Sequence, residues 1–185
     1  NDDIGIGECV RTLVHGGPGT GKTHATKLIK ELFEDVLGWQ QGVQFQVVAF
    51  QAVMAHLIGG DTIHHALGIL VFAHGRASEE QLASHMAVAK RMLQCRWLII
   101  DEISMVGHEL FNFINLRLQR IKGNNQVFGG ISIMSVGDLF QLKPVMDGWI
   151  FNDLIKDYGP IATNLWKEYF TMHELTEIMR QKDDD

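Results

Sequence analysis

The chain has few cysteines and no apolar run long enough to cross a membrane. Its 185 residues include only 2 cysteines, Cys9 and Cys95. Each lies in or beside an apolar stretch, which suits reduced thiols better than a disulfide framework. A spanning helix needs about 20 consecutive apolar residues, and the N-terminal residues lack the charged-then-apolar pattern of a secretion signal. These absences predict an intracellular protein that does not associate with membranes.

An excess of positive charge is also absent. Lysine and arginine number 16 against 22 acidic residues, a formal net charge of -6. This balance excludes proteins that hold nucleic acid by neutralising many phosphates, because those need a surplus of cations. It leaves open a narrow channel that holds single strands by stacking and a few local contacts. With 46% hydrophobic and 21% charged residues, the chain is typical of one ordered globular domain.

A glycine-rich segment fits the phosphate-loop pattern GxxxxGKT. It comprises Gly16, Gly17, Pro18, Gly19, Thr20, Gly21, Lys22 and Thr23. Glycine allows positive φ and lets backbone N–H groups approach phosphate oxygens closely. A strand through Leu13 and Val14 and a helix over 24–37 would place a helix start against the anion. The segment predicts binding of a nucleoside triphosphate, with Lys22 on the terminal phosphates and Thr23 on Mg²⁺.

The rest of the chain alternates between expected strands and expected helices. Strands are expected at 43–50, 97–100, 131–136 and 170–175, with helices at 51–58 and around 110–122. Such alternation predicts an α/β fold with three layers, α/β/α, and a mainly parallel central sheet. Residues 1–10 are expected to be a lead segment that could be disordered, and 11–185 a single domain.

Two acids follow the apolar strand at 97–100. Asp101 and Glu102 would lie at the carboxyl edge of the sheet, where the phosphate loop also opens. Asp101 would hold Mg²⁺ together with Thr23, and Glu102 would polarise the attacking water. A water-activating carboxylate favours hydrolysis over phosphoryl transfer to another acceptor. The alternative is an acid pair stabilised at a helix start by the helix dipole.

Two further polar residues complete the predicted site. Gln141 follows the strand at 131–136 and could donate to the γ-phosphate while accepting from water. Arg180 could neutralise charge on the departing phosphate. Taken alone, each of these residues would more often be a solvated surface side chain, so the prediction depends on the full set.

Five motifs together resemble the Pif (petite integration frequency) family of superfamily-one DNA helicases. The motif that starts at Gly137 discriminates best, because a phosphate loop with an Asp-Glu pair occurs in many unrelated ATPases. The motifs are Gly-Gly-Pro-Gly-Thr-Gly-Lys-Thr at Gly16, Gly-Gly-Asp-Thr-Ile-His-His at Gly59, Leu-Ile-Ile-Asp-Glu-Ile-Ser-Met-Val at Leu98, Gly-Asp-Leu-Phe-Gln-Leu-Lys-Pro-Val at Gly137, and Met-Arg-Gln at Met179.

The resemblance implies a RecA-like P-loop ATPase, the first of two such domains in a 5′-to-3′ DNA helicase. It implies Mg-ATP as substrate, single-stranded DNA and DNA junctions as partners, roles in repair, recombination or telomere maintenance, and a nuclear or mitochondrial site in a eukaryote. The same resemblance implies that Thr62 and His64 belong to a DNA-contacting motif, although the sequence alone favours a core or capping role for His64 at least as much. The chain departs from the family at Gln51-Ala52, where Thr-Gly is common, and at Met179, where an aromatic is common.

Two other interpretations remain open on the sequence. One is an AAA+-type ATPase associated with DNA, and the other is a non-catalytic nucleotide-binding remnant of a mobile element. Without a second RecA-like domain, which would follow Asp185, the chain is expected to bind nucleotide but to turn over weakly and not to unwind DNA. The sequence does not indicate an oligomeric state.

Overall fold

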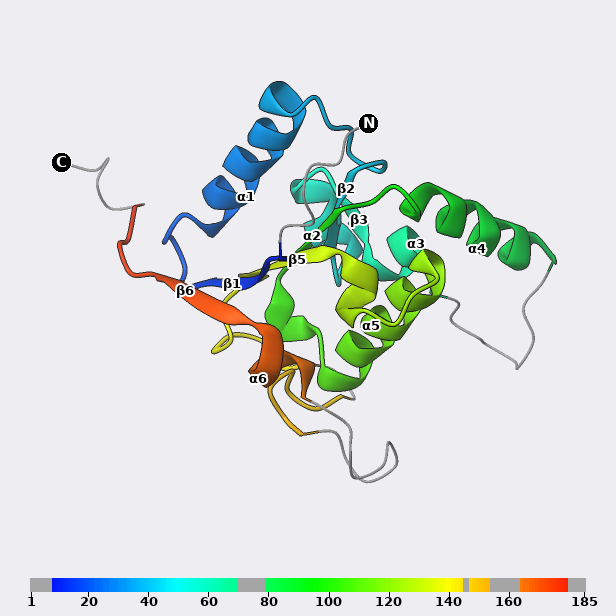
Figure 1. Ribbon diagram of the computed structural model, residues 1–185. Coiled ribbons are helices and arrows are strands. Elements are labelled where there is room, and N and C mark those ends of the chain that lie inside the picture. Colours follow the sequence, from blue (N-terminus) through cyan, green and yellow to red (C-terminus); the bar gives the residue numbers. More distant parts are fainter. Residues whose placement is uncertain (1–7, 70–78, 145–146, 154–163, 180–185) are drawn as a thin grey trace.

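One parallel sheet forms the centre of the computed structural model (Figure 1). The structure describes residues 8–69, 79–144, 147–153 and 164–179, with only the backbone for 79–85. Within these residues the strand order is β3-β2-β4-β5-β1-β6, and every pair is parallel. The strands are β1 (Arg11–Gly16), β2 (Phe45–Ala49), β3 (Asp61–Thr62), β4 (Trp97–Asp101), β5 (Ser132–Gly137) and β6 (Thr171–Leu175). The predicted parallel α/β sheet is confirmed.

Helices cover both faces of this sheet. The side chains of β4 alternate, so that Leu98 and Ile100 face one apolar cluster and Ile99 faces the other. Figure 1 shows α1 apart from α3, α4 and α5, on the other side of the strands. The helices are α1 (Lys22–Glu31), α2 (Ala52–Leu57), α3 (Ile63–Leu67), α4 (Glu79–Met92), α5 (His108–Lys122) and α6 (Leu165–Tyr169).

The observed elements differ from the expected ones in three main respects. The helix expected at 24–37 starts two residues earlier, and its last part, Leu32–Val36, is a π-helical turn. The strand expected at 43–50 is shortened to β2 because the backbone N–H groups of Val43 and Gln44 are turned back to Gln40 O. The two-residue β3 and the short α6 were not expected, since segments this short carry no periodicity.

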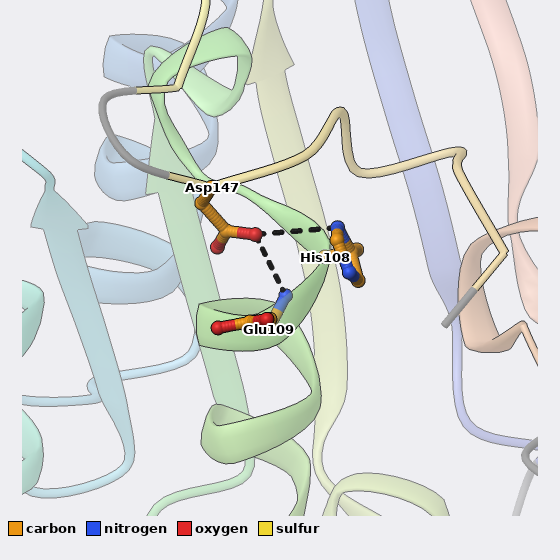
Figure 2. Close-up of side chains that lie close together, drawn as sticks. All are labelled: His108, Glu109 and Asp147. Atoms are coloured by element: carbon orange, nitrogen blue, oxygen red, sulfur yellow. Dashed lines mark hydrogen bonds and ion pairs between the residues drawn. The ribbon is translucent and has the colours of Figure 1, made fainter. Parts of the chain in front are cut away.

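The start of α5 is hydrogen-bonded to Asp147, which lies in a segment distant in the sequence (Figure 2). Asp147 accepts hydrogen bonds from the backbone N–H groups of Glu109 (3.3 Å) and Leu110 (3.2 Å), so it caps a helix 37 residues away. His108 N–H donates to Gly148 O at 3.1 Å. A side chain on Gly107 would collide with Asp147, so glycine is required for this close approach.

Replacing Asp147 by alanine should lower the free energy of unfolding by about 1–2 kcal/mol, because first-turn amides of α5 lose their acceptor. Urea denaturation followed by circular dichroism measures this. Asp35→Ala is the matched control, since Asp35 is exposed. Equal loss in both variants would show that Asp147 does not act as the cap.

Candidate nucleotide-hydrolysis site

The phosphate loop connects the end of β1 to the start of α1. Gly19 and Gly21 have φ of 79° and 89°, in the left-handed region that favours glycine. Gly16 is packed so closely that a side chain there would collide with Thr20 Oγ1. Thr20 Oγ1 in turn donates to Gly17 O at 2.9 Å. Because α1 starts directly after the loop, the amides of its first turn provide a potential anion site.

The ammonium group of Lys22 lies inside this loop. Nζ donates to Gly16 O at 2.6 Å and to Gly17 O at 2.8 Å. Both acceptors are neutral carbonyl groups, and hydrogen bonds from an ammonium to a charged phosphate are stronger. Lys22 can therefore exchange carbonyl partners for phosphate oxygens without leaving a carboxylate unpaired.

Two acids lie at the end of β4, next to the loop. Asp101 is buried, and burial raises its pKa, while the Glu102 backbone N–H that it accepts at 3.0 Å and the charge of Lys22 act in the opposite direction. The pKa of Glu102 is raised by burial and then by the negative charge of Asp101. Glu102 also has φ of 51°, a strained conformation for a residue with a side chain. A cation bound beside these two carboxylates would therefore offset the cost of burying their negative charges.

The raised pKa of Asp101 gives a pH-dependent cost of folding. Between the ordinary aspartate pKa and the raised one, the folded state binds the proton more tightly, so stability falls as pH rises through this window. Asp101→Asn should therefore be more stable than the parent at pH 7, and the difference should shrink as pH falls towards about 4. Urea titrations at several pH values measure this, with Asp35→Asn as the control. A variant that is less stable at pH 7 would contradict the assignment.

The loop, one acid and the predicted glutamine meet in one cleft of about 470 Å³. It is lined by Pro18, Gly19, Gly21, Lys22, Thr23, Glu102, Gln141 and Met179. Asp101 is not on the lining. It lies close enough to the cleft for the positive charge of Lys22 to act on its pKa, in the lowering direction. Gly16, Gly17 and Thr20 are also off the lining. Arg180 lies outside the described residues.

Comparison with known proteins assigns the chain to a family. The family model for PIF1-like helicases matches residues 7–185. The chain belongs to the PIF1-like helicase family. It is 35% identical over 179 residues to the ATP-dependent DNA helicase PIF1 of Candida albicans, covering 91% of this chain and 19% of that protein. It is also 35% identical over 175 residues to the human PIF1 helicase, covering 91% of this chain and 24% of the relative.

Solved structures of PIF1 helicases share the fold. The crystal structure of Pif1 helicase from Candida albicans matches with a TM-score of 0.70 and 32% identity, over 95% of this chain and 38% of that one. Pif1 helicase from Bacteroides, in complex with ADP-AlF3 and single-stranded DNA, matches with a TM-score of 0.69 and 28% identity. The match covers 95% of this chain and 40% of the Bacteroides chain. The chain is therefore a RecA-like P-loop domain, and it spans about a fifth to a quarter of the length of the two curated relatives.

The residues predicted to contact DNA lie apart from the nucleotide cleft of this PIF1-like domain. His64 lines a second cavity of about 280 Å³ with Phe50, Glu109 and Asp147 among the other lining residues. The His64 and Phe50 rings meet edge-on at 6.2 Å. Thr62 is the N-cap of α3, and its side chain accepts from His65 N–H at 3.3 Å. Thr62 therefore has a structural role that the motif alone did not indicate.

Within the described part of the chain, two places offer ligands for a cation. Thr23 and Asp101 provide hydroxyl and carboxylate oxygens, the donor type that Mg²⁺ prefers, and a cation would offset the burial of Asp101. One possible ligand atom from each of His108, Glu109 and Asp147 also lies within 4.8 Å of the other two. The carboxylate of Asp147, however, already accepts hydrogen bonds from backbone amides at the positive end of α5 (Figure 2), and this positive end opposes a cation there.

Among the described residues, no helix has the length and apolar character needed to cross a membrane.

Two residues at this site were not among the predicted catalytic or ligand residues. They are Met179, which the sequence showed only as a departure from the family pattern, and Asp138, which is not on the cleft lining. Met179 lines the cleft and donates its backbone N–H to Gly19 O at 2.9 Å, which brings the segment after β6 against the phosphate loop. Asp138 is buried, and its charge contributes to raising the pKa of Glu102. The position of Asp138 directly after β5, like that of Asp101 at the end of β4, was the signal that could have revealed it.

Proposed function

We propose that residues 11–185 form the first RecA-like domain of an ATP-dependent DNA helicase. The observation that carries this proposal is the single cleft in which Lys22, Glu102 and Gln141 meet at the carboxyl edge of a parallel sheet. A phosphate ligand, a general base and an uncharged amide are the groups that hydrolysis of a γ-phosphate requires. A second RecA-like domain would complete the cleft in the full-length protein.

Each cleft residue has a distinct role in the proposed reaction. The loop amides and Lys22 bind the phosphates and stabilise charge that develops on them. Glu102 accepts a proton from the attacking water, and its raised pKa suits that role. Gln141 orients the same water, and Arg180 offsets charge on the departing phosphate. Thr23 and Asp101 would hold Mg²⁺, which when bound would neutralise charge on the β- and γ-phosphates.

We further propose that single-stranded DNA crosses the domain at the cavity lined by Phe50 and His64. Both rings can stack on bases. The carboxylates of Glu109 and Asp147 line the same cavity, so phosphates would be repelled and bases favoured inside it. Pif1 helicase from Bacteroides has been solved bound to single-stranded DNA, which supports this class of partner. Movement 5′ to 3′, unwinding of junctions in repair, recombination or telomere maintenance, and a nuclear or mitochondrial site in a eukaryote belong to the same proposal.

Replacing His64 by alanine should weaken single-stranded DNA binding about 5- to 100-fold, the range for loss of one base-stacking contact. Fluorescence anisotropy of a labelled oligonucleotide, with the full-length protein, measures this. His56→Ala is the control, because His56 is exposed on α2. If the two variants bind alike, the DNA does not use this cavity.

The experiment that tests the function is ATP hydrolysis by the full-length protein with and without single-stranded DNA, followed by a fluorescence unwinding assay. We expect DNA-stimulated turnover and strand separation from a 5′ overhang. The isolated 185-residue chain should bind nucleotide, turn over weakly and not unwind DNA. Hydrolysis indifferent to DNA would favour a protein-remodelling ATPase, and absent hydrolysis would favour a nucleotide-binding remnant.

A further inference from the structure

The loop that carries Gln141 is held by three consecutive backbone amides. The N–H of Phe140 donates to Asp138 Oδ1 at 2.9 Å, and that of Gln141 donates to Asp138 O at 3.1 Å. Both acceptors belong to the loop itself, so they shape it without fixing it to the rest of the site. The N–H of Leu139 instead donates to His15 Nδ1 at 3.5 Å, a residue 124 positions earlier in the chain.

His15 occupies the junction between two nucleotide motifs. It precedes Gly16, the last residue of β1, and lies opposite Gly137 in the register with β5. The residue is only 6% exposed. The ring of Phe140 meets the His15 ring edge-on, with 5.4 Å between centroids, although Phe140 itself is 88% exposed. One imidazole therefore contacts the Gln141 loop through both a hydrogen bond and a ring.

We propose that His15 is a positioning residue, which holds the Gln141 loop at a fixed distance from the phosphate loop. The inference rests on the proposed hydrolytic function and extends it to a residue outside the cleft lining. To accept the Leu139 N–H at Nδ1, the His15 ring must carry its proton on Nε2 and none on Nδ1. Gln141 is exposed, so the anchoring of its loop decides how often its amide faces the attacking water.

Two substitutions separate the parts of this contact. In His15→Asn the amide oxygen lies close to the place of Nδ1 and can still accept from Leu139, but the ring is lost. In His15→Phe the ring contact with Phe140 remains and the acceptor is lost. If the hydrogen bond positions the loop, His15→Asn should retain more turnover than His15→Phe. The reverse order would overturn the hydrogen-bond assignment.

A double-mutant cycle in the full-length protein tests the proposal. We expect His15→Ala to lower kcat for DNA-stimulated ATP hydrolysis about 3- to 10-fold, as for loss of one hydrogen bond, with KM for ATP changed less than about 2-fold. In a Gln141→Ala background the same change should have almost no further effect, because its target is gone. A purely structural His15 would lower kcat equally in both backgrounds, which would overturn the proposal.

The outcomes distinguish this inference from the proposed function. If the parent hydrolyses ATP and Gln141→Ala slows it, but His15→Ala does not, only the inference fails. If Gln141→Ala leaves turnover unchanged, the role of Gln141 is wrong and the inference falls with it. If the alanine variant of His15 does not fold, the order of turnover of His15→Asn and His15→Phe tests the proposal instead. Thermal melts confirm that both of these variants are folded.

Discussion

Replacing Lys22 by alanine should lower ATP turnover by at least about 100-fold in the full-length protein. Removing one preorganised donor to a charged transition state typically costs a factor of about 10²–10³, and Lys22 is the cation that lies inside the phosphate loop. Nucleotide binding should weaken as well, because the ground-state triphosphate uses the same ammonium group. Release of phosphate measures turnover, and displacement of a fluorescent ATP analogue measures binding.

Lys27→Ala is the matched control for this prediction. Lys27 lies on the same helix and is exposed, so it shares the element without facing the loop. It should hydrolyse ATP at close to the parental rate. If Lys22→Ala retained more than about a tenth of the parental turnover, its ammonium group would not be stabilising the reacting phosphates.

The second large effect is expected for Glu102→Gln. Loss of a general base costs about 10²–10⁴-fold in turnover, and glutamine preserves the size of the side chain while removing its basic oxygen. Binding of Mg-ATP should be retained or tightened, because one negative charge next to Asp101 disappears. Such a variant would separate chemistry from binding, which Lys22→Ala does not.

The control for Glu102→Gln is Glu34→Gln, at an exposed position on the π-helical turn. It should leave both turnover and binding unaffected. A Glu102→Gln variant that lost nucleotide affinity in step with turnover would contradict the role of a base. It would indicate instead that the carboxylate shapes the binding site, as its left-handed backbone conformation at φ 51° would also allow.

The convergence of the nucleotide site was predictable from the sequence because of strand polarity. The carboxyl ends of parallel strands meet at one edge, so residues after β1, β4 and β5 had to approach one another. Lys22, Glu102 and Gln141 do so. The burial of Asp101 behind the cleft lining was less predictable. Asp101 is the last residue of a strand buried on both faces, and the cleft lining excludes it.

Contacts between distant segments could not be predicted. The carboxylate that accepts first-turn amides of α5 comes from Asp147, and the acceptor for Leu139 comes from His15, 124 residues away. Neither contact leaves a pattern in the local sequence, because each depends on how two loops pack after the sheet has formed. Thr62 is a local contact that the motif did not indicate: its side chain caps α3, and its predicted contact with DNA stays a prediction.

The most direct test of the account is a crystal structure of the chain with Mg²⁺, ADP and aluminium fluoride. The account predicts that Lys22 Nζ leaves Gly16 O and Gly17 O for the phosphates. It predicts that Glu102 and Gln141 face the in-line water, with Thr23 and Asp101 on the metal side. A nucleotide bound elsewhere, or one bound in the cleft with Lys22 still on the two carbonyl groups, would contradict it.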